Sequence, residues 1–344
     1  MSEDSTAALP HLWTREGFNG PVSVVVRRGY APDYLTVDGP HAPRRVVLER
    51  LVPRDSSDAD ALPTVVATSR CGLSLLTSAR TRPMPFTLRN VAADELHFIQ
   101  SGTVRFDTDV GSLVAGEGDF VCIPRAVAYR YAPVNGGMRS LILSSPDALA
   151  LTPPVPVGMI NFGRDVQHAE VDREVGLSGP CKLLLKGENE EVTTFVMPHD
   201  PLLLDGRLSN VPVWKLNLKN ILCHTYEPIG GPPSMFMSSR EGRSFLFNLS
   251  SRSGERPPVH VNADFDEVIL YVRGPGSWGV CNEPGTLTLV PKGVIHHGPL
   301  EAVPEGYQAW LLETRATLRW TPEALATAEL MDTSSYGVHA SAQG

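Results

Sequence analysis

Two histidines and a glutamate in the later part of the chain have the types and spacing of a metal site. The stretch His260-Val-Asn262 is followed by Glu267, and Pro291-Lys-Gly-Val-Ile-His296 comes further along. Two imidazoles and one carboxylate are the ligands of iron(II) sites that activate oxygen, and they leave coordination positions open. The pattern predicts a metal centre of His260, Glu267 and His296. Fe²⁺ is the first choice, and Mn, Ni and Zn are alternatives because the same ligands accept several divalent ions.

Short β-strands are needed to bring these three side chains together. Side chains alternate across a strand, so His260 and Asn262 share one face, and Glu267 joins them if the bend between restores the register. Turns at Gly274 and at Pro291-Lys-Gly293 then return the chain, so that His296 lies on a neighbouring strand. Asn262 is a candidate catalytic residue that hydrogen-bonds a substrate or orients a ligand.

The composition describes an ordinary globular chain of two domains. It has 344 residues, 42% of them hydrophobic and 20% charged, with a net charge of −8. Lys and Arg form no clustered stripe, so we expect no nucleic-acid partner. No apolar run is long enough to span a membrane and the polar start lacks signal-peptide features, so we expect a cytoplasmic protein. Five cysteines without paired spacing indicate reduced thiols.

Prolines and glycines, thirty of each, separate many short apolar runs, which predicts a mostly β chain of barrels or sandwiches. A short C-terminal helix is expected from Thr321, the cap, with Ala324 to Met331 propagating it. The proline-rich segment before Gly158 predicts a link between two domains, 1–157 and 158–332, and residues 333–344 are expected to be a disordered tail.

An internal duplication is the simplest explanation of a repeated pattern. The shared positions are Asp94-Glu95 with Asp266-Glu267, Gly102 with Gly274, Gly118 with Gly285, and Pro124 with Pro291. In the earlier copy Leu88 takes the place of His260 and Tyr129 that of His296, so only Glu95, beside Asn90, survives. A lone carboxylate cannot hold a transition metal against water. We therefore expect a structural first domain without metal ligands and an active second one.

The two motifs resemble those of the cupin superfamily, which consists of small β-barrels that bind metal inside. Further stretches resemble the homogentisate 1,2-dioxygenase family: residues 15–23, 94–125, 214–220, 297–299 and 309–313. This resemblance implies a bicupin of two jelly-roll barrels and a homo-oligomer. It also implies an Fe(II)-dependent oxidoreductase of aromatic compound catabolism that cleaves the ring of a homogentisate- or hydroquinone-like substrate with O₂.

Carried over by position, the family's ligands fall on His260, Glu267 and one histidine of the pair His296 and His297. Spacing from Pro291 selects His296, whereas the family's His-Gly-Pro ending selects His297; we predict His296. The family's acid/base histidine falls on Leu208, which leaves the exact substrate open. The catalytic base is then either the second histidine of the pair, His297, or His224.

Two other functions fit the same residues. One is a cupin isomerase, hydrolase or oxidase that uses another divalent metal, and the other is a non-catalytic bicupin that binds a small molecule. A structural metal would be enclosed by protein ligands, whereas a catalytic one keeps a position open.

Overall fold

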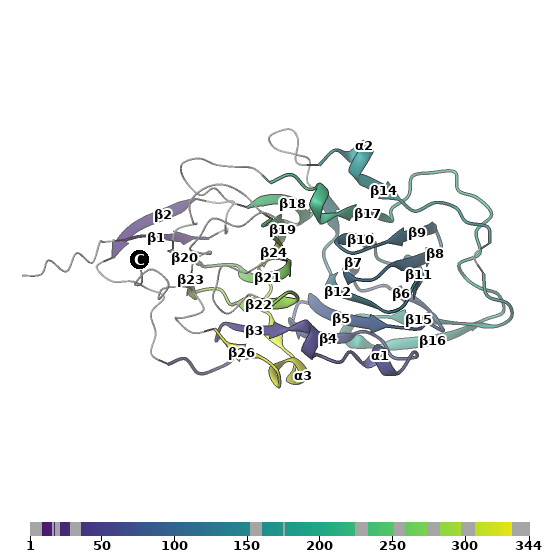
Figure 1. Cartoon of the computed structure of the whole chain (residues 1–344), viewed down its shortest axis with the longest axis horizontal. Coiled ribbons are helices and arrows are strands. Elements are labelled where there is room, and N and C mark those ends of the chain that lie inside the picture. Colours follow the sequence, from purple (N-terminus) through teal and green to yellow (C-terminus); the bar gives the residue numbers. More distant parts are fainter. Residues whose placement is uncertain are drawn as a thin grey trace, which may run out of the picture.

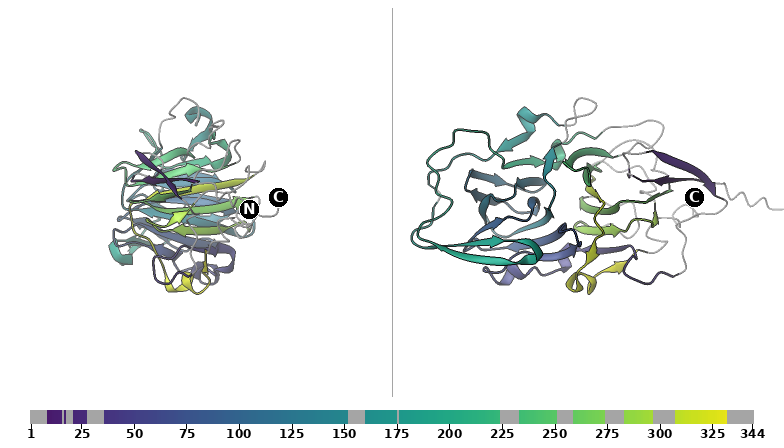
Figure 2. Two further views of the ribbon diagram at one scale, coloured as in Figure 1. Left: turned by 90° about the vertical axis from the view of Figure 1, so that its left-hand side faces the viewer. Right: turned by 180° about the vertical axis from the view of Figure 1, so that it is seen from behind.

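The described residues of the chain form four stacked β-sheets. The computed structural model describes residues 9–15, 17, 21–27, 36–151, 160–174, 176–223, 233–250, 259–273, 283–296 and 307–331. The sheets follow one another along the long axis of the molecule (Figures 1 and 2). The six-stranded sheet and one eight-stranded sheet form the first barrel; the other eight-stranded sheet and the four-stranded sheet form the second barrel. The predicted fold class, mostly β with two barrels, is confirmed.

The first barrel has its eight-stranded inner sheet toward the middle of the molecule and its six-stranded outer sheet at the end. The inner sheet runs β14 (Val166–His168), β17 (Trp214–Asn217), β10 (Asp119–Ile123), β7 (Asp94–Ser101), β12 (Met138–Ser145), β5 (Ser74–Arg80), β4 (Thr64–Thr68) and β25 (Arg319–Trp320). The outer sheet runs β16 (Val192–Met197), β15 (Cys181–Lys186), β6 (Thr87–Asn90), β11 (Ala128–Pro133), β8 (Val104–Thr108) and β9 (Gly111–Ala115).

The second barrel repeats this plan at the other end. Its inner sheet runs β13 (Leu149–Leu151), β18 (Ser234–Ser239), β19 (Ser244–Asn248), β24 (Gln308–Thr314), β21 (Asp266–Arg273), β22 (Thr286–Val290), β3 (Arg44–Val47) and β26 (Glu329–Leu330). Its outer sheet runs β2 (Val22–Arg27), β1 (Leu9–Thr14), β20 (Val259–Asn262) and β23 (Ile295–His296). The helices are short: α1 (Arg54–Ser57), α2 (Phe162–Asp165), α3 (Pro322–Leu325), and the 3₁₀ turns η1 (Leu48–Arg50), η2 (Glu188–Glu190) and η3 (Leu218–Asn220).

The two inner sheets pack face to face through a shared apolar core. Phe98 of β7 lies 5.7 Å from Trp310 of β24, and Phe120 of β10 lies 5.2 Å from Phe236 of β18, between ring centroids. Because an inner sheet is covered on both faces, β10 is buried along its whole length and shows no alternation of polar and apolar residues. This core holds the two barrels together as one body.

Each barrel is completed by a segment that precedes the other barrel in sequence. The hairpin of β1 and β2 runs parallel along β20 of the second barrel, and the hairpin of β15 and β16 runs parallel along β6 of the first. Likewise β3 pairs with β22, whereas β17 pairs with β10. The duplication therefore extends beyond the metal motifs. The ranges 1–157 and 158–332 stay a prediction, although the sheets draw strands from both sides of residue 157; residues 333–344 lie outside the described residues.

The C-terminal helix is shorter than predicted. The Thr321 side chain caps it by accepting from the Ala324 N–H, as expected, but α3 ends at Leu325 and Glu329–Leu330 form β26. Pairing with β3 gives this segment a backbone ladder, and it buries Met331 in the core of the second barrel. The extension to Met331 was therefore wrong, because sheet pairing outweighs helix propensity here.

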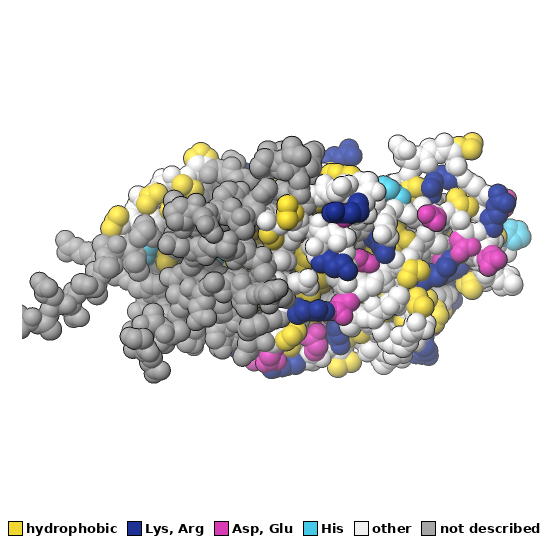
Figure 3. Space-filling model, turned by 45° about the horizontal axis from the view of Figure 1, so that its top comes forward, with side chains coloured by type: hydrophobic (Ala, Val, Ile, Leu, Met, Phe, Trp, Pro, Cys, Tyr) yellow, Lys and Arg dark blue, Asp and Glu magenta, His cyan; other side chains and the backbone are white. Residues whose placement is uncertain are grey.

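The charged surface of the first barrel is mixed in sign. On the face in Figure 3, Lys and Arg side chains alternate with Asp and Glu side chains. Among the helices that the structure describes, none has the length and apolar character needed to cross a membrane. The absence of a nucleic-acid partner stays a prediction.

Candidate metal centre

His260, Glu267 and His296 converge inside the second barrel. Strands β20 and β23 pair antiparallel with His260 directly opposite His296, and Glu267 lies near the start of β21 in the inner sheet. One possible ligand atom from each residue lies within 4.8 Å of the other two. All three are buried, with exposed fractions of 6%, 4% and 2%. The outer sheet thus supplies two imidazoles and the inner sheet one carboxylate, and these are the three side chains that the sequence motifs singled out.

The hydrogen bonds of His296 orient its ring toward the carboxylate. Its Nδ1 lies 3.0 Å from the carbonyl oxygen of Val294, which can only accept, so Nδ1 carries the proton. Its Nε2 then faces Oε2 of Glu267 at 3.2 Å. In a neutral imidazole with this tautomer, the lone pair of Nε2 would face a lone pair of the ionised Glu267 carboxylate, which is unfavourable. A positive species, either a proton or a metal ion, must therefore lie between the two atoms.

Electrostatics couples the two groups when a proton fills this role. Burial alone raises the pKa of Glu267, but the charge and hydrogen bond of His296 and the charge of His260 hold that pKa below its ordinary value. Burial alone lowers the pKa of His296, but the charge and hydrogen bond of Glu267 raise it above its ordinary value. The pair favours its ionised form, and a metal cation bound here would replace the shared proton.

The donor set fits a divalent metal. Ligating histidines commonly donate their other ring N–H to a backbone carbonyl, as His296 does to Val294. Among the described residues, this is the one group of three or more His, Cys, Asp or Glu side chains whose ligand atoms converge. That these residues hold a metal stays a prediction, which the geometry permits.

A buried carboxylate that sequence reasoning missed lies beside the centre. Glu313 of β24 is paired in register with Glu267 of β21 and has no exposed surface. The Nδ2 of Asn262, the predicted catalytic amide, donates to its Oε1 at 3.4 Å. Gly17, with φ of +55°, packs so closely that an added Cβ would clash with the Glu313 carboxylate. The signal that could have found Glu313 is its place in the stretch 309–313, which resembles the family.

At the equivalent place in the first barrel, Glu95 accepts hydrogen bonds from neighbouring side chains. Tyr129 lies opposite Leu88 in the register of β11 and β6, just as His296 lies opposite His260. Glu95 accepts from Oη of Tyr129 at 2.5 Å and from Nδ2 of Asn90 at 2.9 Å. The register confirms the predicted correspondence of the two copies.

These contacts keep Glu95 ionised. Burial raises its pKa, but the charge of His97, whose Nε2 lies 3.9 Å from Oε2, the charge of Lys186 and the Tyr129 hydrogen bond outweigh burial and lower the pKa to about 2. In the described part of the first barrel, Glu95 does not belong to any group of three possible metal ligands. The first barrel therefore satisfies its carboxylate from within the protein.

Of the remaining predicted residues, two lie outside the described part of the chain and one lies on the surface. His224 and His297, the two candidate bases, lie outside the described residues. Leu208, at the position of the family's acid/base histidine, is fully exposed on the surface.

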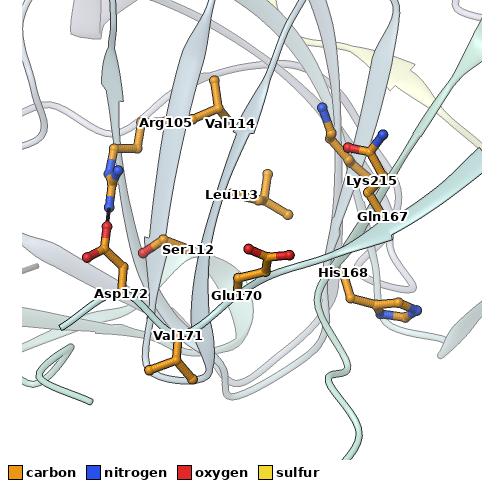
Figure 4. A pocket seen from close by; sticks show the side chains of 10 residues that line it. All are labelled: Arg105, Ser112, Leu113, Val114, Gln167, His168, Glu170, Val171, Asp172 and Lys215. Carbon is orange, nitrogen blue, oxygen red and sulfur yellow. Dashed lines mark hydrogen bonds and ion pairs between the residues drawn. The ribbon is translucent and has the colours of Figure 1, made fainter. Parts of the chain in front are cut away.

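A cavity of about 620 Å³ on the first barrel, shown in Figure 4, offers no alternative centre. Its Arg105 is paired with Asp172 at 2.6 Å, and Lys215 is paired with Asp119 at 3.3 Å. Its cations are thus neutralised by neighbouring carboxylates.

Comparison with known proteins gives distant matches. No family model matches the chain. A protein of Saccharolobus solfataricus named "Putative dioxygenase" is 25% identical over 221 residues, which cover 61% of this chain and 57% of that protein. The chain thus spans little more than half the length of that relative.

Two solved structures resemble most of the chain. An oxalate decarboxylase mutant of Bacillus subtilis has a TM-score of 0.42 at 15% identity, over 84% of this chain and 80% of that one. A cupin 2 conserved barrel domain protein of Leptotrichia buccalis has a TM-score of 0.38 at 11% identity, over 79% and 96%. Because these scores are low, the assignment rests on strand order and register: two barrels joined by a shared core form a bicupin-like fold.

Proposed function

We propose that this protein is an iron(II)-dependent dioxygenase that cleaves the ring of a hydroxylated aromatic compound with O₂. The observation that carries the proposal is the buried cluster of His260, Glu267 and His296, which has the two-imidazole, one-carboxylate composition of oxygen-activating iron sites. The dioxygenase name of the Saccharolobus solfataricus relative supports the same reaction class. The resemblance to the homogentisate 1,2-dioxygenase family suggests a homogentisate- or hydroquinone-like substrate.

In this proposal the metal centre is built from buried side chains. His260, Glu267 and His296 would hold the iron, and the Val294 carbonyl fixes the tautomer of His296. When bound, iron(II) supplies Lewis acidity toward a phenolic oxygen and electrons for the reaction with O₂. Buried apolar side chains of the second barrel, including Phe247 and Leu311, exclude water from the interior.

The amide of Asn262 has a positioning role in this proposal. It shares the inward face of β20 with His260, and its Nδ2 donates to Glu313. This contact points the amide nitrogen toward Glu313, which leaves the amide oxygen to accept from a substrate hydroxyl. The proton of the phenol would be taken by His224 or His297, which remain the candidate bases because Leu208 has no proton acceptor.

A homo-oligomer and a cytoplasmic location are also part of the proposal. Strand β2 is an edge strand of the second barrel's outer sheet, and every residue of β2 is exposed, including Val24 at 61% and Val26 at 68%. Exposed apolar edge strands are commonly covered by another chain. Analytical ultracentrifugation of the wild type and of a Val24→Lys, Val26→Lys variant tests this, because the variant should dissociate.

Oxygen uptake tests the reaction. Protein loaded anaerobically with Fe²⁺ should consume O₂ with at least one compound from a panel of hydroquinones, catechols and aminophenols, and ring-opened product should form in equal amount. Glu267→Gln should abolish uptake, whereas His168→Ala, which changes an exposed histidine of the first barrel, should not.

Absence of uptake with every compound would contradict the proposal. Turnover that needs Mn²⁺ and consumes no oxygen would instead identify a cupin enzyme of the isomerase or hydrolase type.

A further inference from the structure

The mouth of the first barrel contains a cavity that the proposed reaction does not use. Its volume is about 300 Å³, at the lower end of the range of small-molecule sites. Four polar residues that line it are almost fully buried: Ser74, Asn90, Ser144 and Lys186, each at most 5% exposed. The cavity belongs to the first barrel, whereas the candidate metal centre lies in the second.

The strand register places these groups side by side. Ser144 of β12 lies between Ser74 of β5 and Glu95 of β7, and Lys186 of β15 is paired with Asn90 of β6. In the described part of the chain, no hydrogen bond occupies the hydroxyl of Ser74 or Ser144. A buried ammonium and two available hydroxyl donors are the groups that bind an anionic oxygen.

The Lys186 ammonium is already paired with a carboxylate of the protein, that of Glu190. Oε1 of Glu190 lies 3.0 Å from Nζ of Lys186, although the Glu190 side chain is 54% exposed and that of Lys186 only 7%. Glu190 reaches Lys186 from the 3₁₀ turn η2, in which Asn189 and Glu190 have φ of +53° and +62°. Residues other than glycine seldom adopt this conformation, so the turn holds Glu190 over the cavity against its local preference.

We propose that the mouth of the first barrel binds a small monocarboxylate through Lys186, Ser74 and Ser144, and that Glu190 is an internal competitor for the same ammonium. The Glu190 carboxylate shows that a carboxylate fits against the Lys186 ammonium. A ligand displaces Glu190 into solvent, where that side chain is already half exposed. The proposal is independent of the metal and of ring cleavage.

Calorimetric titration of the metal-loaded protein tests the site. Acetate and benzoate are the titrated ligands, and each replaces chloride so that the ionic strength stays constant. This is needed because a change in salt screening would itself alter ion-pair energies. Glu190→Gln should tighten binding by roughly fivefold, which is the upper range for an exposed ion pair. Lys186→Met should weaken binding by about tenfold or more, since a charged hydrogen bond is lost.

Lys182→Met is the matched control. Lys182 lies on the same strand, but it is 58% exposed and pairs with Asp60 on the surface, so its loss should leave the affinity unchanged. If Lys186→Met fails to fold, Ser74→Ala and Ser144→Ala test the site in its place. Each variant should weaken carboxylate binding severalfold. A crystal soaked with 4-bromobenzoate should show its bromine signal in the cavity beside Lys186.

Several results would overturn the proposal. Binding that is equal in the wild type, Glu190→Gln and the Lys186 or serine variants would place the carboxylate elsewhere, such as at the metal. No heat from either carboxylate with Glu190→Gln would refute the site itself. Inorganic phosphate that binds as tightly as benzoate and depends on Lys186 would refute the assignment to a monocarboxylate.

Discussion

Replacing Tyr129 by Phe tests the idea that the first barrel balances its buried carboxylate with hydrogen bonds and not with a metal. Tyr129 is 1% exposed, and its hydroxyl donates to the ionised Glu95 at 2.5 Å. Removing a hydrogen bond to a buried charge costs about 1.5–3 kcal/mol, and the phenyl ring keeps the apolar packing. We expect Tyr129→Phe to lower the free energy of unfolding by about 2 kcal/mol or more.

Tyr131→Phe is the matched control. Tyr131 is equally buried, but its hydroxyl pairs with the neutral Ser78 hydroxyl at 2.8 Å, so its loss should cost only about 1 kcal/mol. Urea unfolding at pH 7, followed by fluorescence and circular dichroism, measures both variants. Equal losses in the two variants, or a loss below about 0.5 kcal/mol for Tyr129→Phe, would refute the reasoning.

Three further predictions follow from the two barrel interiors. The pKa of Glu95 is lowered from 4.5 to about 2, so ionised Glu95 contributes about 3 kcal/mol to the free energy of unfolding. This contribution is present above pH 4.5 and is lost as the pH falls toward 2. In acid unfolding, the free energy of unfolding of Glu95→Gln should therefore change less over this pH range than that of the wild type. Gly17→Ala should lower the melting temperature more than Gly242→Ala, because both glycines have positive φ but only an added Cβ at Gly17 meets the Glu313 carboxylate; equal shifts would contradict this contact. Asn262→Ala should cost about 1 kcal/mol of stability yet reduce ring cleavage by tenfold or more, and steady-state kinetics that show unchanged turnover would assign Asn262 a structural role.

The candidate centre was predictable from sequence because its residues lie in two short motifs whose strands and turns follow local rules. Alternation along β20 fixes the face of His260, and the turn at Gly293 returns His296 to the neighbouring strand. The repeat then predicted that Leu88 and Tyr129 occupy the same places in the first barrel, which the register confirms. Strand alternation and turns can be predicted from sequence because they depend on residues that are close together in the chain.

Features that depend on distant pairing were not predictable. Hairpin β1–β2 covers the second barrel through parallel pairing with β20, and no residue pattern in the hairpin specifies that partner. Glu313 follows the apolar run from Ala309, where an acid ordinarily marks the exposed end of a strand. Its burial follows from its place on a central strand of the inner sheet, where Asn262 and Gly17 from other parts of the chain pack against it.

Metal stoichiometry with X-ray absorption is the most direct test of the central claim that His260, Glu267 and His296 form the metal centre. The account predicts about one iron per chain, with two imidazole nitrogens and a carboxylate among its ligands. Iron should be lost in His296→Ala and retained in His168→Ala. Iron that stays bound at full stoichiometry in His296→Ala, or an absorption spectrum without imidazole ligands, would contradict the account.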